Sequence, residues 1–134
     1  MRWRPLPSRT SGQALVEFAF ASVFFLSIVF GTIDFGLVIF TYSQLHNAVR
    51  EGARYAKVHC PDTAENRDDV RDVVIDKSPQ LGLDYAAVDV QTFGCVPPTG
   101  YLHVSASADF SAITQEFLGI SPITLTSSAR VDVE

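Results

Sequence analysis

The fold is decided by one uncharged stretch, Phe18-Ala-Phe-Ala-Ser-Val-Phe-Phe-Leu-Ser-Ile-Val-Phe-Gly-Thr-Ile33, which has sixteen residues and no Asp, Glu, Lys or Arg. Counting from Ala14 to Ile33 gives twenty positions, with Glu17 near the beginning. A helix needs about 20 predominantly apolar residues to cross a bilayer. The stretch therefore predicts a membrane-spanning helix of minimal length.

The charges that precede this stretch predict its orientation. Residues 1–12 contain three arginines and no acidic residue (Arg2, Arg4 and Arg9). The positive-inside rule assigns such an end to the cytoplasm. A cleavable secretory signal is the alternative, but no small-x-small cleavage site follows the apolar stretch. We therefore expect a single-pass protein of the cytoplasmic membrane, with its amino terminus in the cytoplasm and its carboxy-terminal part outside.

Composition divides the chain into an arginine-bearing segment (1–12), a membrane helix (13–42) and an extracytoplasmic head (43–134). The 10 Lys and Arg against 15 Asp and Glu give a net charge of −5. Because three of the basic residues lie in 1–12, the remaining chain is more acidic still. A nucleic-acid binder needs a basic surface, so we exclude that class. A head of about 90 residues buries only a modest core, so we expect no small-molecule substrate.

The pattern of apolar residues predicts an α+β fold. The first helix should continue to His59, because Leu45, Val49, Gly52 and Ala56 recur at helical spacing, and it would be about 70 Å long. A second helix should begin after Asp62, read as its N-cap with Glu65 three residues on, and should end before Pro79. Its apolar stripe is Val70, Val73 and Val74.

Beyond Pro79 the apolar period changes to two, which is typical of strands. Three such segments occur, at 88–92, 102–110 and 123–133, with a short helical turn expected at Ile113–Leu118 between the second and third. Each has one apolar face, which predicts a mostly antiparallel sheet packed on one side. Its packing partner should be the small-residue face of the long helix around Ala48, Gly52 and Ala56. The order of the strands stays open.

Two cysteines, Cys60 and Cys95, are too few for a structural zinc site and lie in no Cys-x-x-Cys pair. If the head lies outside the cytoplasm, one disulfide is the expected state. Closing about 36 residues would then be worth roughly 4 kcal/mol in the chain-entropy model.

The segment Gly12-Gln-Ala-Leu-Val-Glu17-Phe18 resembles the processing site of type IV pilin-like precursors. The resemblance implies cleavage by a prepilin peptidase between Gly12 and Gln13, which would make residues 1–12 a cytoplasmic leader peptide and Glu17 the fifth residue of the mature chain. A carboxylate inside a membrane helix needs a partner. After cleavage, Glu17 could pair with the new amino group of Gln13 on a neighbouring subunit. The alternative is a Glu that complements the helix macrodipole.

A second pair of segments is similar to the TadE-like pseudopilins, or minor pilins, of tight-adherence (Flp, type IVc) pilus systems. These segments are Gly31-Thr-Ile-Asp34-Phe-Gly36 and Val49-Arg50-Glu51-Gly52-Ala53-Arg54-Tyr-Ala56. The resemblance covers residues 12–58 and implies a role in pilus assembly and cell adhesion, as initiation, capping or bridging to the assembly platform. The implied partners are other pilins and pseudopilins, the Tad assembly platform, prepilin peptidase and membrane lipid.

Other residues have plainer interpretations. Asp34 is expected at the outer headgroup boundary rather than in an inter-subunit pair. Arg50, Arg54 and Lys57 could bind an acidic patch on another pilin, and a solvated face or a lipid headgroup contact is an equal alternative. Asp68, Asp72 and Asp76 lack the glycine-containing loop of a calcium site. His46, His59 and His103 are isolated in the sequence, so we expect no enzyme, no metal and no cofactor. The competing hypothesis is an unprocessed single-pass membrane protein with an external binding head.

Overall fold

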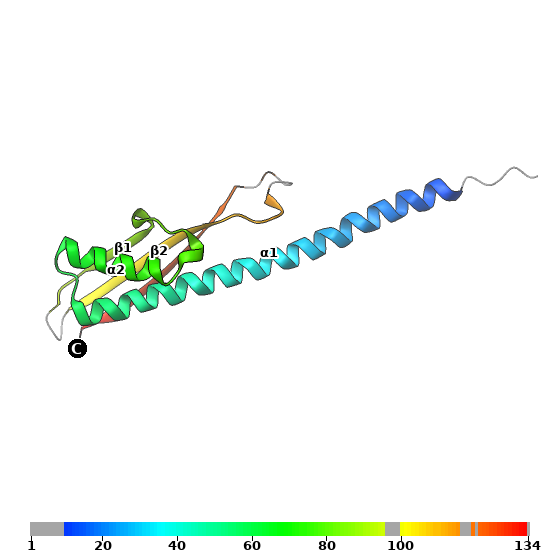
Figure 1. The fold of residues 1–134 in the computed structure, drawn as a ribbon. Helices are drawn as coiled ribbons and strands as arrows, with labels where there is room; N and C mark the ends of the chain where they lie inside the picture. The colour runs from blue at the N-terminus through cyan, green and yellow to red at the C-terminus, as the bar shows by residue number, and fades with distance from the viewer. Residues whose placement is uncertain (1–9, 96–99, 116–118, 120, 134) are drawn as a thin grey trace, which may run out of the picture.

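The computed structural model describes residues 10–95, 100–115, 119 and 121–133. Its elements follow the order helix, helix, two short 3₁₀ turns and three strands (Figure 1). They are α1 (Thr10–His59), α2 (Ala64–Asp76), η1 (Pro79–Leu81), η2 (Tyr85–Ala87), β1 (Val88–Thr92), β2 (Tyr101–Phe110) and β3 (Ile123–Asp132). The predicted α+β class is confirmed.

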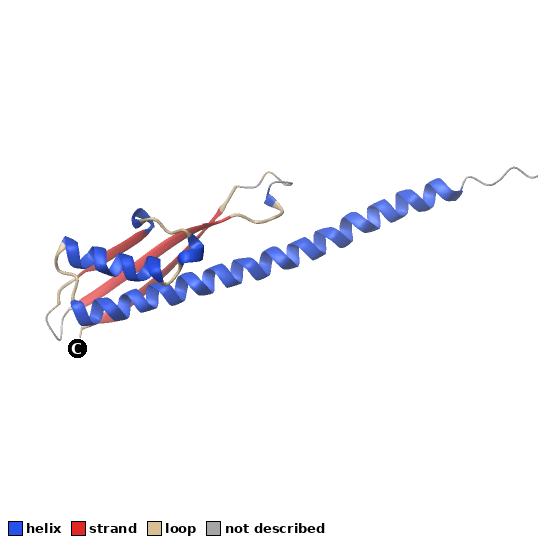
Figure 2. Ribbon diagram, viewed as in Figure 1, coloured by secondary structure: helices blue, strands red, loops and turns tan. Residues whose placement is uncertain are grey.

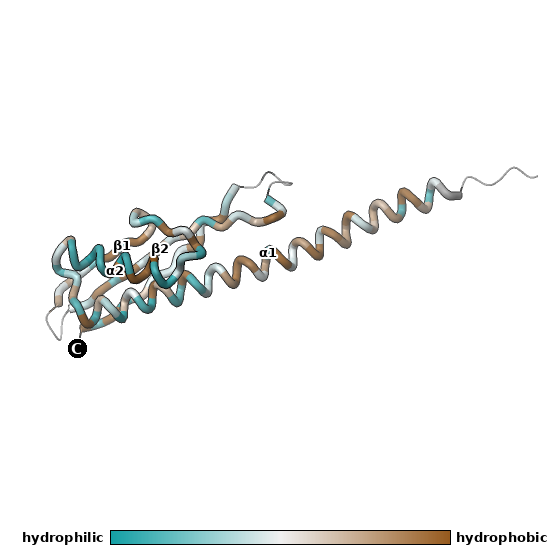
Figure 3. The backbone as a smooth tube through the Cα atoms, in the orientation of Figure 1, coloured by the Kyte–Doolittle hydropathy of each residue, from teal (hydrophilic) through white to brown (hydrophobic). Residues whose placement is uncertain are grey.

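Helix α1 is a single unbroken helix of 50 residues, three residues longer at its beginning than predicted. Its carboxy-terminal part lies along the head, and its amino-terminal part projects away from it (Figure 1). The projecting part is also the most apolar part of the helix (Figure 3). Helix α1 ends at His59, and the next residue, Cys60, has a positive φ of 32°. A left-handed residue directly after the last helical turn is a common way to end a helix.

The strands form one antiparallel sheet in the order β1-β2-β3. The register pairs Val90 with Val104, and Val104 with Ala129, so that residues of the same face lie opposite one another. Helices α1 and α2 cover one face of this sheet (Figure 2). The simple up-and-down order follows from two connections that each join neighbouring antiparallel strands.

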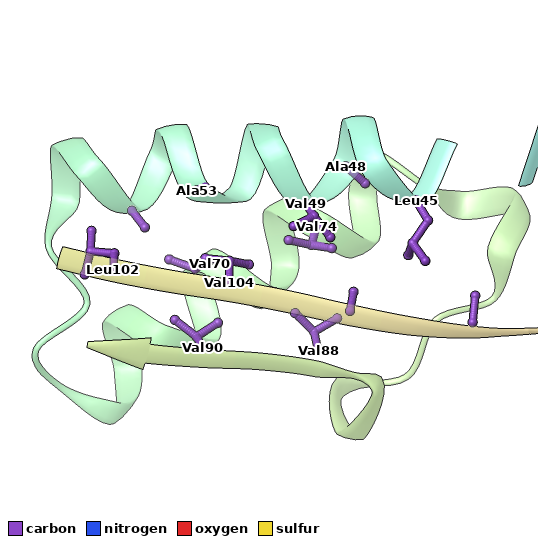
Figure 4. Close-up of a cluster of buried hydrophobic side chains, with 13 residues drawn as sticks. Leu45, Ala48, Val49, Ala53, Val70, Val74, Val88, Val90, Leu102 and Val104 are labelled. Carbon is purple, nitrogen blue, oxygen red and sulfur yellow. The ribbon is translucent and has the colours of Figure 1, made fainter. Parts of the chain in front are cut away.

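The core lies between the two helices and the sheet (Figure 4). It contains small and branched apolar residues from α1, α2, β1 and β2: Leu45, Ala48, Val49, Ala53, Ala56, Val70, Val74, Val88, Val90, Leu102, Val104, Ala106 and Ala108. The predicted contact face of α1 is therefore correct. Gly52 belongs to it as well, because a Cβ at this position would come closer to Cγ2 of Val74 than real Cβ atoms approach.

The beginning of α2 differs by one residue from the prediction. Thr63, in an extended conformation, is the N-cap, and its hydroxyl accepts a hydrogen bond from the Asn66 amide at 3.2 Å. Asp62 instead accepts a hydrogen bond from the Asn66 side chain. The predicted Asp62–Glu65 capping box was wrong. Thr63 is equally able to cap a helix, and it stands three residues before Asn66, from whose backbone amide it accepts a hydrogen bond. In the apolar stripe, Val70 and Val74 are buried and Val73 is half-buried.

The helical turn predicted between β2 and β3 falls partly on residues 116–118, outside the described residues. Gln115 is helical, and the Gly119 amide donates a hydrogen bond to the Gln115 carbonyl at 2.8 Å. Gly119 itself has a φ of +64°, which suits a glycine at the end of a turn.

Candidate functional site

The residues of the predicted processing segment lie at the projecting end of α1. Gly12 stands in its first turn, and Gln13, Glu17 and Phe18 are exposed, Phe18 to 71%. Within the described residues, Glu17 has neither an ion pair nor a hydrogen bond to another side chain. Among the residues that the structure describes, this carboxylate therefore has no counter-ion.

The projecting part of α1 satisfies its own hydroxyl groups. Ser22, Ser27 and Thr32 each donate a hydrogen bond to the carbonyl four residues earlier, at 2.8 Å. Their polar atoms thus need no water, which is the condition for polar residues on a helix surrounded by lipid. Among the described residues, α1 is the single helix long and apolar enough to cross a membrane.

Asp34 is the first residue of α1 that the head buries. Its side chain is 7% exposed, whereas its neighbour Phe35 is 67% exposed. One carboxylate oxygen accepts a hydrogen bond from the Ile113 amide at 2.8 Å. The other accepts two from Thr114, one from the amide at 3.1 Å and one from the hydroxyl at 2.6 Å. Asp34 thus fixes the connection between β2 and β3 to the helix, an internal role that neither of the two sequence interpretations included.

The segment Arg50-Glu51-Gly52-Ala53-Arg54 divides into a buried and an exposed half. Gly52 and Ala53 face the core, where the missing side chain of Gly52 allows α1 and α2 to approach each other. Arg50 and Arg54 are exposed, and Glu51 forms an ion pair with Arg54 at 3.1 Å. The two glycines nearer the amino terminus are different, because a Cβ at Gly31 or Gly36 would meet nothing within 4 Å.

The exposed arginines border a shallow groove of roughly 600 Å³ between α1 and the edge strand β3. Arg130 of β3 stands on its opposite side, with its guanidinium 4.0 Å from the centre of the Tyr101 ring. The groove therefore carries positive charge from two elements. Asp132 lies 3.3 Å from Arg130 and offsets part of that charge.

A disulfide joins Cys60 to Cys95, with the two Cα atoms 5.9 Å apart. It ties the end of α1 to the connection that follows β1. This lies at the end of the head opposite to Asp34, so that the disulfide and the Asp34 hydrogen bonds hold the sheet to α1 near both of its ends.

The three histidines remain apart in the fold. His46 lies 3.1 Å from the Ser127 hydroxyl, His59 stacks on Tyr55, and His103 is part of β2. Within the described part of the chain, no three His, Cys, Asp or Glu side chains come together as a metal site requires. The aspartates of α2 are engaged locally: Asp68 pairs with Arg71 at 2.6 Å, and Asp72 accepts a hydrogen bond from the Tyr85 hydroxyl.

Sequence reasoning missed the partners of Asp34. Thr114 carries a hydroxyl and stands in a short uncharged stretch, but nothing in its sequence position marks it as a ligand of a carboxylate 80 residues away. The available signal was Asp34 itself, an acid directly after the apolar stretch 18–33. A carboxylate that becomes buried needs hydrogen-bond donors or a positive charge beside it.

A family model, described as TadE-like protein, matches residues 12–54. The match ends four residues before the end of the segment, residues 12–58, in which the sequence resembles this family. It includes every candidate residue except the two cysteines. Neither a search of curated proteins nor a search of solved structures finds a match. The part of the chain from the glycine of the first turn to the exposed Arg54 of α1 is therefore similar to the TadE-like family.

Proposed function

We propose that this chain is a minor pilin or pseudopilin that prepilin peptidase cleaves between Gly12 and Gln13, and that enters the Tad pilus or its assembly platform through the amino-terminal part of α1. Residues 1–12 are then the cytoplasmic leader, 13–42 the membrane and assembly helix, and 43–134 the external head. The observation that carries the proposal is Glu17, an exposed carboxylate with no partner in the described part of the chain, on an apolar helix that the head leaves uncovered.

The position of Gly12 suits proteolysis. It lies in the first turn of α1, where the amide groups have no carbonyl partner within the helix. Opening this turn to place the Gly12–Gln13 bond in a protease therefore breaks few hydrogen bonds. Glycine is also among the poorest helix formers, which lowers the cost of unwinding further.

Cleavage creates the partner that Glu17 lacks. The new amino group of Gln13 is positively charged at neutral pH, and in a bundle of parallel helices it can reach Glu17 of an adjacent subunit. In lipid an unpaired carboxylate is unfavourable, so this pair favours the one axial offset that brings the two groups together. Small residues such as Ala14, Ala19, Ala21 and Gly31 allow neighbouring helices to approach closely.

The test of processing is the intact mass of the chain from cells with and without prepilin peptidase. We expect a mature chain that begins at Gln13 only when the peptidase is present. A chain that keeps Met1–Gly12 in peptidase-containing cells would contradict the proposal and favour an unprocessed single-pass protein with a binding head.

The role of the carboxylate is tested by Glu17→Gln, with Glu51→Gln on the same helix as the matched control. Both variants lose one negative charge, but Glu51 is paired to Arg54 inside the chain. We expect Glu17→Gln to be cleaved and inserted normally and to be depleted from sheared pilus fractions, whereas Glu51→Gln is recovered with them. Equal recovery of the two variants would show that Glu17 has no special part in assembly.

A further inference from the structure

Ile113 and Thr114, which follow β2, lie beside α1 at one definite level, which Asp34 sets. The three hydrogen bonds from Ile113 and Thr114 to Asp34 hold the described residues of the connection against this turn of the helix. Toward the amino terminus, residues 13–33 are exposed or half-buried, so the head does not cover them. Asp34 therefore marks the boundary between the free and the covered part of α1.

The length of the free part matches a bilayer. Residues 13–33 are 21 residues, or about 31 Å of helix at 1.5 Å per residue. The hydrocarbon core of a bilayer is about 30 Å thick. A helix that fills this core with residues 13–33 places Asp34 directly outside it, among the lipid headgroups. Ile113 and Thr114, held at the level of Asp34, then reach the same depth.

The surface at this level is apolar on both elements. Ile113 in the connection is 47% exposed, Ile123 at the beginning of β3 is 53% exposed, and Phe35 on α1 is 67% exposed. Phe35 and Ile123 line a groove of roughly 300 Å³, together with Gly31, Val38 and Phe110. Residues 111–123 contain a single charged residue, Glu116. In water this surface would be unfavourable, and it is continuous with the apolar surface of residues 13–33.

We infer that the described ends of the β2–β3 connection form a membrane-contacting element of the head, in which Ile113 and Ile123 lie at the level of the headgroups and touch the outermost part of the acyl chains. The inference rests on the proposed membrane residence of α1. Asp34 acts as the positioning residue: its carboxylate, hydrogen-bonded to the connection, fixes the depth of the head. The partner is the phospholipid surface around the chain's own helix, because this surface meets the groove without a break.

The test measures the depth of single tryptophans in the full-length chain. Trp3 is the one tryptophan of the sequence, so Trp3→Phe gives a background without it. Into this background we would introduce Ile113→Trp, Ile123→Trp or the control Ser128→Trp, which stands exposed on β3 five residues, or about 17 Å, beyond Ile123. Each variant is placed as one copy per nanodisc of phosphatidylethanolamine and phosphatidylglycerol, with acyl chains brominated near the headgroup.

We expect the bromines to quench the fluorescence of the tryptophans at 113 and 123 severalfold more strongly than that at 128. Because each disc holds one copy, a neighbouring pilin cannot produce this difference. Equal quenching at all three positions in chains that elute with the lipid would overturn the inference and leave the membrane residence of α1 intact. Chains that fail to enter the discs would overturn both, and the cleavage assay would then report independently on processing.

Discussion

Replacing Gly52 by alanine tests the packing of the head most directly. The added Cβ would overlap Cγ2 of Val74, and it would also lie 3.7 Å from the Val70 carbonyl and 3.8 Å from Cγ1 of Val104. Val74 is fully buried and branched at Cβ, so it has no open space and no second favourable rotamer on the helix. The clash must therefore be relieved by moving α1 and α2 apart.

The magnitude follows from two opposing effects. Overpacking of a close-packed core costs about 1–3 kcal/mol. Alanine in place of glycine within a helix gains up to about 1 kcal/mol. Since the overlap is severe, the upper half of the first range applies, and we expect a net loss of about 1–2 kcal/mol in the free energy of unfolding. For a domain of this size that lowers Tm by about 5–15 °C.

The assay is thermal unfolding of the full-length chain in mild detergent, followed by near-ultraviolet circular dichroism of the tyrosines in the head. Gly36→Ala is the matched control, because it lies on the same helix and its Cβ would meet nothing. We expect Gly36→Ala to melt at or above the Tm of the unsubstituted chain.

A double-mutant cycle with Val74→Ala isolates the contact itself. Val74→Ala removes the methyl group that the new Cβ meets, so the double variant should be more stable than the sum of the two single losses by about 0.5–3 kcal/mol. A Gly52→Ala chain that melts with the unsubstituted protein, or a cycle without coupling, would refute the reasoning about α1–α2 approach.

Three further perturbations test the ends of the head. Reducing the Cys60–Cys95 disulfide, or replacing both cysteines by serine, should lower the free energy of unfolding by roughly 3–4 kcal/mol, measured by urea denaturation; a loss under about 1 kcal/mol would mean that the link adds little constraint. Thr63→Ala should cost about 1 kcal/mol through loss of the α2 cap, and Asp62→Ala clearly less; the reverse order would restore Asp62 as the cap. Asp34→Ala removes the acceptor of the Ile113 and Thr114 amides, and hydrogen bonds to a charged group contribute about 1.5–3 kcal/mol, so amide exchange at these residues should accelerate roughly 10- to 100-fold. Asp89→Ala, an exposed acid on β1, is the control for that experiment, and unchanged exchange in Asp34→Ala would show that the connection is held by other contacts.

The sequence by itself determined the elements. An uncharged stretch of sixteen residues and a run of helical spacings specified α1, and alternating apolar residues specified the three strands, because both patterns depend on neighbours along the chain. It also selected the face of α1 that meets the sheet, since small residues such as Ala48 and Ala56 recur at helical spacing. Gly12 and Glu17 could be singled out for the same reason: their meaning lies in a fixed local spacing.

The tertiary structure alone decided the long-range contacts. Val74 as the neighbour of Gly52, the strand order β1-β2-β3, and Thr114 as the partner of Asp34 join residues far apart in the sequence. Asp34 illustrates the physical reason. Its carboxylate requires compensation wherever it is buried, which the sequence can signal, but the compensating groups are two backbone amides and a hydroxyl 79 and 80 residues away. Amides are present at almost every residue, so only the folded path of the chain determines which of them the acid meets.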